Sequence, residues 1–278
     1  MSTPSEIPGV ERHAAARSNL GSIALTETLG VPVHALLTPA GEDAASVAVG
    51  LFSAAPTDAV LVTFANPGTV LLVRRSASFR RDLDAFDFVL PDGVGMCLAM
   101  KWLHRIAPRR VSFDTTSLAP EIFSHARERD LGIVLIGGAP GIAETAAGRI
   151  AEHFPGVRIL GAFDGYGHAD GDAAKVRELR PAIVICGMGG GRQEAFLLKL
   201  REQGWRGWGF TCGGYLDQLQ TDLRYYPRWV DDAHLRWAYR LMREPGRLWR
   251  RYLIDYSQFG LLLCAALASR RRLTPAPG

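Results

Sequence analysis

The sequence predicts an α/β fold, a mostly parallel sheet with helices on both faces, followed by a helical appendage. Between residues 31 and 215, short continuous apolar runs alternate with stretches of helical periodicity, which is typical of strands buried on both faces by helices. The apolar fraction of 47% is sufficient for such a core. After Tyr215 the chain becomes rich in arginine and tryptophan, which indicates a separate appendage.

We therefore expect three parts. Residues 1–25 are polar and have the character of a flexible N-terminal arm. Residues 26–220 form the α/β domain. Residues 221–278 form a basic, tryptophan-rich helical appendage whose helices are separated at Pro245.

The expected strands and helices alternate along the chain. Strands are predicted for VPVHALL, AVLVTFA, DFVL, LGIVLIGG, GVRIL, PAIVICGMG and WRGWGFTCGG. Helices are predicted for EDAASVAVGLFSAA, NPGTVLLVRRSASFRRDL, GVGMCLAMKWLHRI, GIAETAAGRIAEHF, residues 172–179 and GRQEAFLLKLREQG. Asn66 is expected to cap the second of these helices, with Pro67 at its first helical position.

The candidate site lies at the strand-to-helix junctions, because parallel α/β sheets bind ligands beyond the carboxyl ends of their strands. Four junctions stand out: TFANPG, LPDGVG, IGGAPG and CGMGGGRQE. In the second, Asp92 follows a buried strand and precedes Gly93. Two roles remain open for Asp92: a helix cap, or a general base that accepts a proton from an attacking hydroxyl group.

The other polar junctions are equally open to two interpretations. IGGAPG lacks the strict dinucleotide fingerprint and could be a tight turn or a phosphate-binding helix start. Three consecutive glycines before Gln193 and Glu194 favour close approach of a ligand, although the helix dipole alone favours a glutamate there. Arg110 and Asp114 could form a surface ion pair, or Arg110 could clamp a phosphate.

Cysteine and histidine spacing predicts neither a metal site nor disulfides. The four cysteines lie far apart without a CxxC motif, and the seven histidines show no ligand spacing. We therefore expect no metal, no cofactor, and reduced thiols in a cytoplasmic protein. No signal peptide is recognisable, and the apolar run Phe259–Ala268 is too short to span a bilayer as a helix.

The net charge of +4 is unevenly distributed. From Leu223 onward there are 11 arginines and 4 acidic residues, a net charge of +7, so the preceding 222 residues carry −3. A cationic segment interleaved with tryptophan fits a solvated helical face, a membrane interface, or the phosphates and bases of a nucleic acid.

Taken together and in this order, the junctions resemble the WecG/TagA/CpsF glycosyltransferases, glycosyltransferase family 26. The resemblance covers about Val31 to Leu253. It is carried by TFANP, FVLPDGVG, RRVSFD, VLIGGAPGIAETAA, FPGVRILGAFDGY, GMGGGRQE, CGGYLD and PRWVDDAHLRWAYRLMREPGRLWRRYL. It implies a Rossmann-like enzyme that moves a sugar from a UDP-sugar to a polyprenyl-diphosphate-linked acceptor, with inversion and without an obligatory metal.

The resemblance also implies roles for individual residues. Asp92 matches the family's proposed general base, and Thr63 and Asn66, separated here by two residues, match two further residues of the same pocket. The residues expected to bind the substrate are Arg110, Gly137, Gly138, Gly187, Gly189, Gln193, Glu194 and Asp217. Those expected to meet the lipid diphosphate and the membrane are Arg228, Arg240, Arg243, Arg247 and Arg250.

Some residues depart from the family pattern. Gly191 and Arg192 stand where the family has proline and lysine, Arg236 replaces an acidic residue, and YYP replaces RAP. These changes point to a sugar other than the N-acetylmannosamine common in the family, such as glucose or a uronic acid for an exopolysaccharide.

Two other functions remain open from the residues alone. A nucleotide-dependent oxidoreductase would use the glycine loop, and a nucleic-acid-binding protein would use the basic appendage. As a transferase, the protein is expected to be peripheral on the inner face of the cytoplasmic membrane, with a UDP-sugar and a lipid-linked acceptor as partners and no nucleic acid. The sequence leaves the oligomeric state open, a homo-oligomer included.

Overall fold

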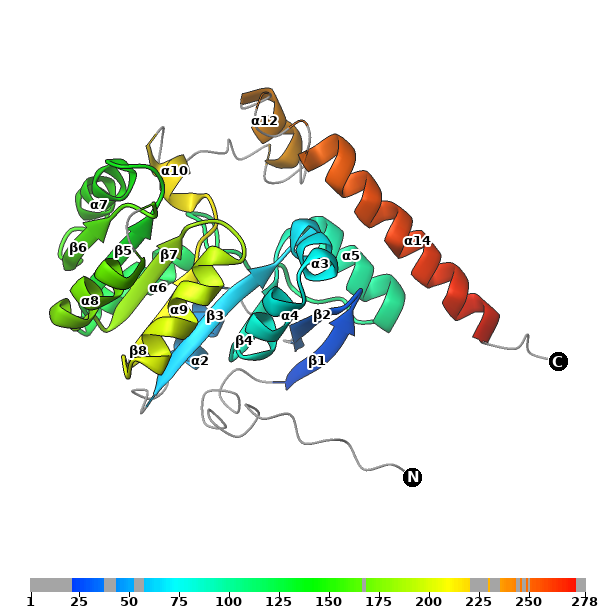
Figure 1. Ribbon diagram of the computed structural model, residues 1–278, viewed down its shortest axis with the longest axis horizontal. Helices are drawn as coiled ribbons and strands as arrows, with labels where there is room; N and C mark the ends of the chain where they lie inside the picture. The colour runs from blue at the N-terminus through cyan, green and yellow to red at the C-terminus, as the bar shows by residue number, and fades with distance from the viewer. Residues whose placement is uncertain are drawn as a thin grey trace.

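The computed structural model describes residues 22–37, 44–52, 58–166, 169–220, 230, 236–243, 246, 249 and 251–273. A six-stranded sheet forms its centre, in the order β4-β3-β8-β7-β5-β6, and every neighbouring pair is parallel (Figure 1). The strands are β3 Ala59–Ala65, β4 Phe88–Pro91, β5 Ile133–Gly137, β6 Ile159–Phe163, β7 Ile183–Gly187 and β8 Gly207–Thr211. The predicted parallel α/β architecture is therefore confirmed.

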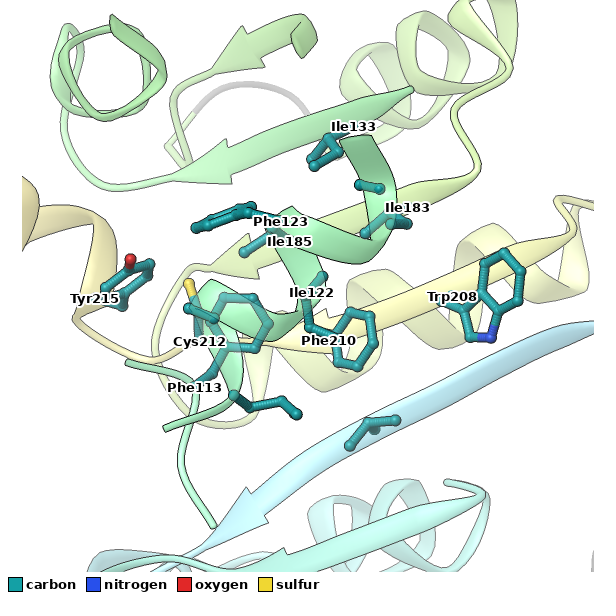
Figure 2. Packing of buried hydrophobic residues seen from close by; sticks show 14 of the residues in the cluster. Phe113, Ile122, Phe123, Ile133, Ile183, Ile185, Trp208, Phe210, Cys212 and Tyr215 are labelled. Carbon is teal, nitrogen blue, oxygen red and sulfur yellow. The ribbon is translucent and has the colours of Figure 1, made fainter. Parts of the chain in front are cut away.

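Helices cover both faces of the sheet because successive strand residues point to opposite sides. In β5, Ile133 and Leu135 belong to one apolar cluster, and Val134 and Ile136 belong to the other. The first cluster, part of which Figure 2 shows, is closed by α2 Ala44–Leu51, α6 Leu118–Glu128, α7 Ile142–His153 and α10 Tyr215–Leu219. The second is closed by α3 Pro67–Arg75, α4 Ala77–Asp84, α5 Gly93–His104, α8 Ala169–Leu179 and α9 Arg192–Glu202.

The helix predicted from Asn66 onward is two helices, α3 and α4. Asn66 caps α3 as expected: its side chain accepts a hydrogen bond from the Gly68 N–H at 2.9 Å, and Pro67 is the first helical residue. Ser76 then adopts an extended conformation with φ −142° and ψ 105°. Its hydroxyl accepts a hydrogen bond from the Phe79 N–H at 3.2 Å, so this serine ends α3 and caps α4.

The expected boundary of the N-terminal arm, after residue 25, is wrong because a strand begins at Ser22. Residues 1–21 lie outside the described residues, but Ser22–Thr28 form β1, which pairs antiparallel with β2, Val31–Leu37. The turn uses positive φ angles at Leu29 and Gly30, of 54° and 86°, as hairpin turns require. β2 therefore lies in a separate hairpin, which is joined to the domain where the Val89 N–H donates to the buried His34 Nδ1 at 3.0 Å.

The C-terminal segment contains α12, Arg236–Arg243, a π-helical turn, Arg251–Asp255, and the long helix α14, Tyr256–Leu273. α14 packs against the domain beside α3 and α5 (Figure 1). Phe259 and Leu263 of α14 are buried in the second apolar cluster. None of the described helices has the length and apolar character needed to cross a membrane. Pro245, the expected break, lies outside the described residues.

Candidate active site

A cavity of about 1040 Å³ lies at the carboxyl ends of the central strands. Its walls are the starts of α3, α5 and α9, the segment after α5, and the loops after β5, β7 and β8. The C-terminal segment contributes a further wall through residues between Leu253 and Phe259. The cavity is where the strand-to-helix junctions converge, as the parallel topology predicts.

Asp92 lies at this cavity and does not use its side chain as a helix cap. Its N–H donates to the Ala65 carbonyl at 2.8 Å, which fixes the end of β4 beside the end of β3. The residue occupies the N-cap position of α5 with φ −109° and ψ 136°, without a side-chain capping hydrogen bond. Gly93 follows with φ +78°, which glycine adopts at little cost. Asp92 therefore presents its carboxylate to the cavity.

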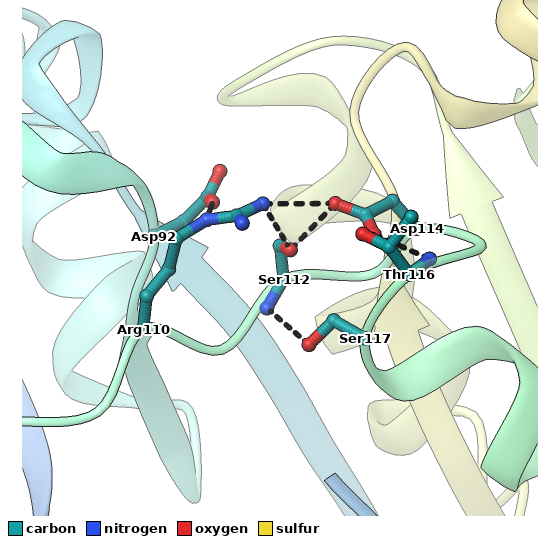
Figure 3. A network of polar contacts seen from close by, with 6 residues as sticks. All are labelled: Asp92, Arg110, Ser112, Asp114, Thr116 and Ser117. Carbon is teal, nitrogen blue, oxygen red and sulfur yellow. Dashed lines mark hydrogen bonds and ion pairs between the residues drawn. The ribbon is translucent and has the colours of Figure 1, made fainter. Parts of the chain in front are cut away.

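Arg110 is held between two carboxylates (Figure 3). Its Nε lies 3.5 Å from Asp92 Oδ1. Its Nη2 lies 2.9 Å from Asp114 Oδ2 and donates to Ser112 Oγ at 2.7 Å. The ion-pair alternative for Arg110 and Asp114 is thus present in the structure, but it is formed at the wall of the cavity and also reaches Asp92.

A second carboxylate network is centred on Glu194, which is buried at the wall of the cavity. Its Oε1 accepts hydrogen bonds from Thr63 Oγ1 and Gln193 Nε2, both at 2.9 Å, and its Oε2 accepts one from the Gly191 N–H at 2.6 Å. The hydroxyls of Thr63 and Thr211 are 2.8 Å apart. Burial raises the pKa of the Glu194 carboxyl, and the hydrogen bonds from Gln193, Gly191 and Thr63 act in the opposite direction.

The expected site residues divide between the cavity surface and the layer behind it. Those that line the cavity are Asn66, Asp92, Arg110, Gly138, Gly187, Gly189, Gln193, Glu194 and Asp217. Thr63 and Gly137 lie behind this surface. Gly137 has φ +144°, and a Cβ there would lie 2.4 Å from the Gly187 carbonyl oxygen, so glycine allows the ends of β5 and β7 to meet.

The structure adds residues that the motifs did not single out as site residues. Arg192 donates to the Met188 carbonyl at 2.7 Å, and its guanidinium lies 5.0 Å from the ring centroid of Tyr166. Both side chains line the cavity. Ser112 joins the Arg110 network, and Thr211 joins the Glu194 network. The signal for Ser112 was its spacing, since residues i, i+2 and i+4 of an extended segment share one face.

The arginines expected to meet the lipid are mostly outside the described residues. Arg228, Arg247 and Arg250 lie there, as does the side chain of Arg240, whose backbone is in α12. The Arg243 guanidinium lies 5.4 Å from the Tyr239 ring centroid on the same helix. In the part of the chain that the structure describes, no three His, Cys, Asp or Glu side chains are grouped in a way that could hold a metal ion.

A parallel α/β sheet with a cavity at its carboxyl edge, glycine junctions and a carboxylate at the cavity wall defines a ligand-binding protein of the Rossmann-like class. The chain matches the family model of the glycosyl transferase WecG/TagA/CpsF family over residues 26–273, and it belongs to this family. Membership decides among the three functions that the sequence left open, in favour of the glycosyltransferase.

Relatives of known activity cover most of the chain. An N-acetylglucosaminyldiphosphoundecaprenol N-acetyl-beta-D-mannosaminyltransferase of Bacillus spizizenii is 28% identical over 197 residues, 70% of this chain and 75% of the relative. A UDP-Gal:alpha-D-GlcNAc-diphosphoundecaprenol beta-1,4-galactosyltransferase of Shigella boydii is 26% identical over 202 residues, 72% of this chain and 83% of the relative. The Bacillus subtilis mannosaminyltransferase is 23% identical over 219 residues, 78% of this chain and 84% of the relative.

Proposed function

We propose that the protein transfers a sugar from a UDP-sugar to a polyprenyl-diphosphate-linked saccharide during synthesis of a bacterial surface polysaccharide or exopolysaccharide. The acceptor is supported by the names of the relatives, which all specify a diphosphoundecaprenol-linked N-acetylglucosamine. The UDP-sugar donor is supported by the Shigella boydii relative, whose name specifies UDP-Gal. The transferred sugar is proposed to be an N-acetylmannosamine-type sugar, glucose or a uronic acid.

The observation that carries the mechanism is the Asp92 carboxylate, which faces the cavity and does not cap its helix. In the proposed step, an acceptor hydroxyl oxygen attacks the anomeric carbon, and Asp92 accepts the hydroxyl proton. The bond between the anomeric carbon and the donor diphosphate breaks, and its electron pair leaves with UDP. Attack from the face opposite the leaving group inverts the anomeric configuration.

The leaving diphosphate gains negative charge, which must be stabilised within the cavity. Backbone N–H groups of the glycine loops and the guanidinium groups of Arg110 and Arg192 are among the donors on its walls. We expect these groups to suffice without a metal ion. Activity that survives a chelator would support this expectation, and activity restored only by Mg²⁺ would overturn it.

We further propose that the protein acts as a peripheral protein at the inner face of the cytoplasmic membrane. The charge of +7 after Leu223 supports this placement, because anionic lipids attract clustered cations. So do the exposed apolar side chains of the C-terminal segment, among them Met242, Leu253 and Leu261.

The test is the Asp92→Asn variant, assayed for sugar transfer to a synthetic polyprenyl-diphosphate N-acetylglucosamine. We expect the rate to fall by about 10²–10⁴-fold, because a general base contributes that much. The matched control is Asp130→Asn, which changes an exposed aspartate paired with Arg158 at 3.4 Å on the surface and should leave the rate unchanged. Full activity of a folded Asp92→Asn variant would remove the proposed base.

A further inference from the structure

We infer that Asp114 is a positioning residue, which draws the Arg110 guanidinium toward itself and so weakens the ion pair between Arg110 and Asp92, so that Asp92 keeps its strength as a base. The inference rests on the proposed function, because it assumes that Asp92 accepts the acceptor proton. It concerns the three side chains that Figure 3 places in one row, with Arg110 in the middle.

The Arg110 guanidinium lies closer to the Asp114 carboxylate than to the Asp92 carboxylate. Arg110 Nη2 lies 2.9 Å from Asp114 Oδ2, which is hydrogen-bond distance, whereas Arg110 Nε lies 3.5 Å from Asp92 Oδ1. A charge-assisted hydrogen bond between these groups is normally about 2.7–2.9 Å long. Arg110 therefore forms a close hydrogen-bonded ion pair with Asp114 and a longer ion pair with Asp92.

Asp114 is itself fixed, so it cannot follow Arg110 toward Asp92. Its Oδ1 accepts hydrogen bonds from the Thr116 N–H at 2.9 Å and the Thr116 hydroxyl at 2.7 Å. Its Oδ2 accepts a hydrogen bond from Ser112 Oγ at 2.6 Å. The side chain of Asp114 is 14% exposed, and that of Arg110 is 31% exposed. The Asp114 side chain, which holds the guanidinium, is thus better shielded from water than the Arg110 side chain.

A backbone hydrogen bond fixes the position of Asp92 relative to Arg110. The Val111 N–H donates to the Pro91 carbonyl at 3.0 Å, which places the segment carrying Arg110 directly beside the residue that precedes Asp92. At this distance an unrestrained arginine could form a close, two-point ion pair with Asp92. Such a pair would stabilise the carboxylate form and make it a weaker proton acceptor.

Other charged or titratable groups among the described residues line the same cavity as Asp92 or lie close to it. They include Arg75 of α3, Asp255 of the C-terminal segment, and Glu194, Arg192 and Asp217. Cys97 of α5 has its pKa raised to about 11, first by burial and second by the Asp92 charge. The thiol is therefore neutral wherever the enzyme is assayed near neutral pH.

The experiment is a pH–rate profile of the Asp114→Asn variant. We expect the acid limb, where activity rises as the base loses its proton, to move to lower pH by about one unit. Two causes act in this direction: a negative charge near Asp92 is removed, and Arg110 is released to pair with Asp92. The plateau rate should fall by less than about 10-fold, because a base weaker by about one unit accepts the proton less readily.

Ser112→Ala tests the same inference without changing the charge of Arg110 or Asp114. It removes the hydroxyl that bridges Arg110 and Asp114, and a smaller shift of the acid limb to lower pH is expected. In an Arg110→Gln background, Asp114→Asn should lose the part of its effect that acts through the guanidinium and keep only the part due to the removed negative charge, so the shift of the limb should be smaller.

The outcomes separate the inference from the proposed function. An unmoved acid limb in both Asp114→Asn and Ser112→Ala, with Asp92→Asn inactive, would overturn the positioning role and leave the base intact. A shift of the same size with and without Arg110 would also overturn it. An active Asp92→Asn variant would overturn the proposed base, and the inference with it.

Discussion

The site contains two carboxylate networks, and they differ in their access to water. Glu194 is 3% exposed, and its oxygens are occupied by hydrogen bonds from Thr63, Gln193 and the Gly191 backbone. The Asp92 side chain is 30% exposed and faces the cavity, with Arg110 at 3.5 Å. Both residues look alike in sequence, as acids at the start of a helix. The comparison teaches that two acids at helix starts can differ in burial: the Glu194 carboxylate is enclosed by hydrogen bonds that join the ends of β3 and β7, whereas the Asp92 carboxylate is partly exposed at the cavity.

The largest effect is expected when each carboxylate is removed in turn and the free energy of unfolding is measured. Glu194→Ala should lower the free energy of unfolding by about 3 kcal/mol, because it leaves buried donors without acceptors. Asp92→Ala should lower it by less than about 1 kcal/mol, because that side chain makes no capping bond and water reaches it. Chemical denaturation measures both. Equal losses in the two variants would contradict the division of roles.

The pH dependence of stability sharpens the comparison. Burial raises the pKa of folded Glu194 above its ordinary value of 4.5. Between 4.5 and the raised value, the native state binds more protons at this residue than the unfolded state, so stability falls as the pH rises through this window. Glu194→Gln does not titrate. The stability of the wild type relative to this variant should therefore decrease as the pH rises above about 4.5, and a constant difference would count against a buried carboxylate.

The smallest expected effect comes from an ion pair at the mouth of the cavity. Arg75 Nη2 lies 3.6 Å from Asp255 Oδ1, with side chains 61% and 31% exposed. Arg75→Ala should change the free energy of unfolding by no more than about 0.5 kcal/mol, because water screens exposed pairs. A thermal or chemical unfolding curve tests this. A large loss would show that charge, and not the burial of Phe259 and Leu263, holds α14 on the domain.

Much of the fold could be predicted because its signals are local. The strands are short apolar runs, and the junction residues Asn66 and Pro67 specify a helix start by themselves. The break at Ser76 was missed because helical periodicity continues across it, and only the backbone geometry shows that this serine caps a second helix. β1 was missed because a hairpin strand is stabilised mainly by its partner. α6 was also not predicted, since its apolar face, with Ile122 and Phe123, is recognised only against the sheet that it covers.

The sequence by itself determined which residues gather at the site, because the carboxyl ends of parallel strands meet at one edge wherever the fold is formed. It placed Asp92, Gln193 and Glu194 there through the ends of β4 and β7, whereas Arg110 was assigned by the family resemblance. Only the tertiary structure decided their depth and their partners. Burial and hydrogen bonding depend on strands β3, β7 and β8, which are distant in the chain and adjacent in the sheet. For this reason the sequence named both acids, and the fold distinguished the buried, hydrogen-bonded Glu194 from the more exposed Asp92.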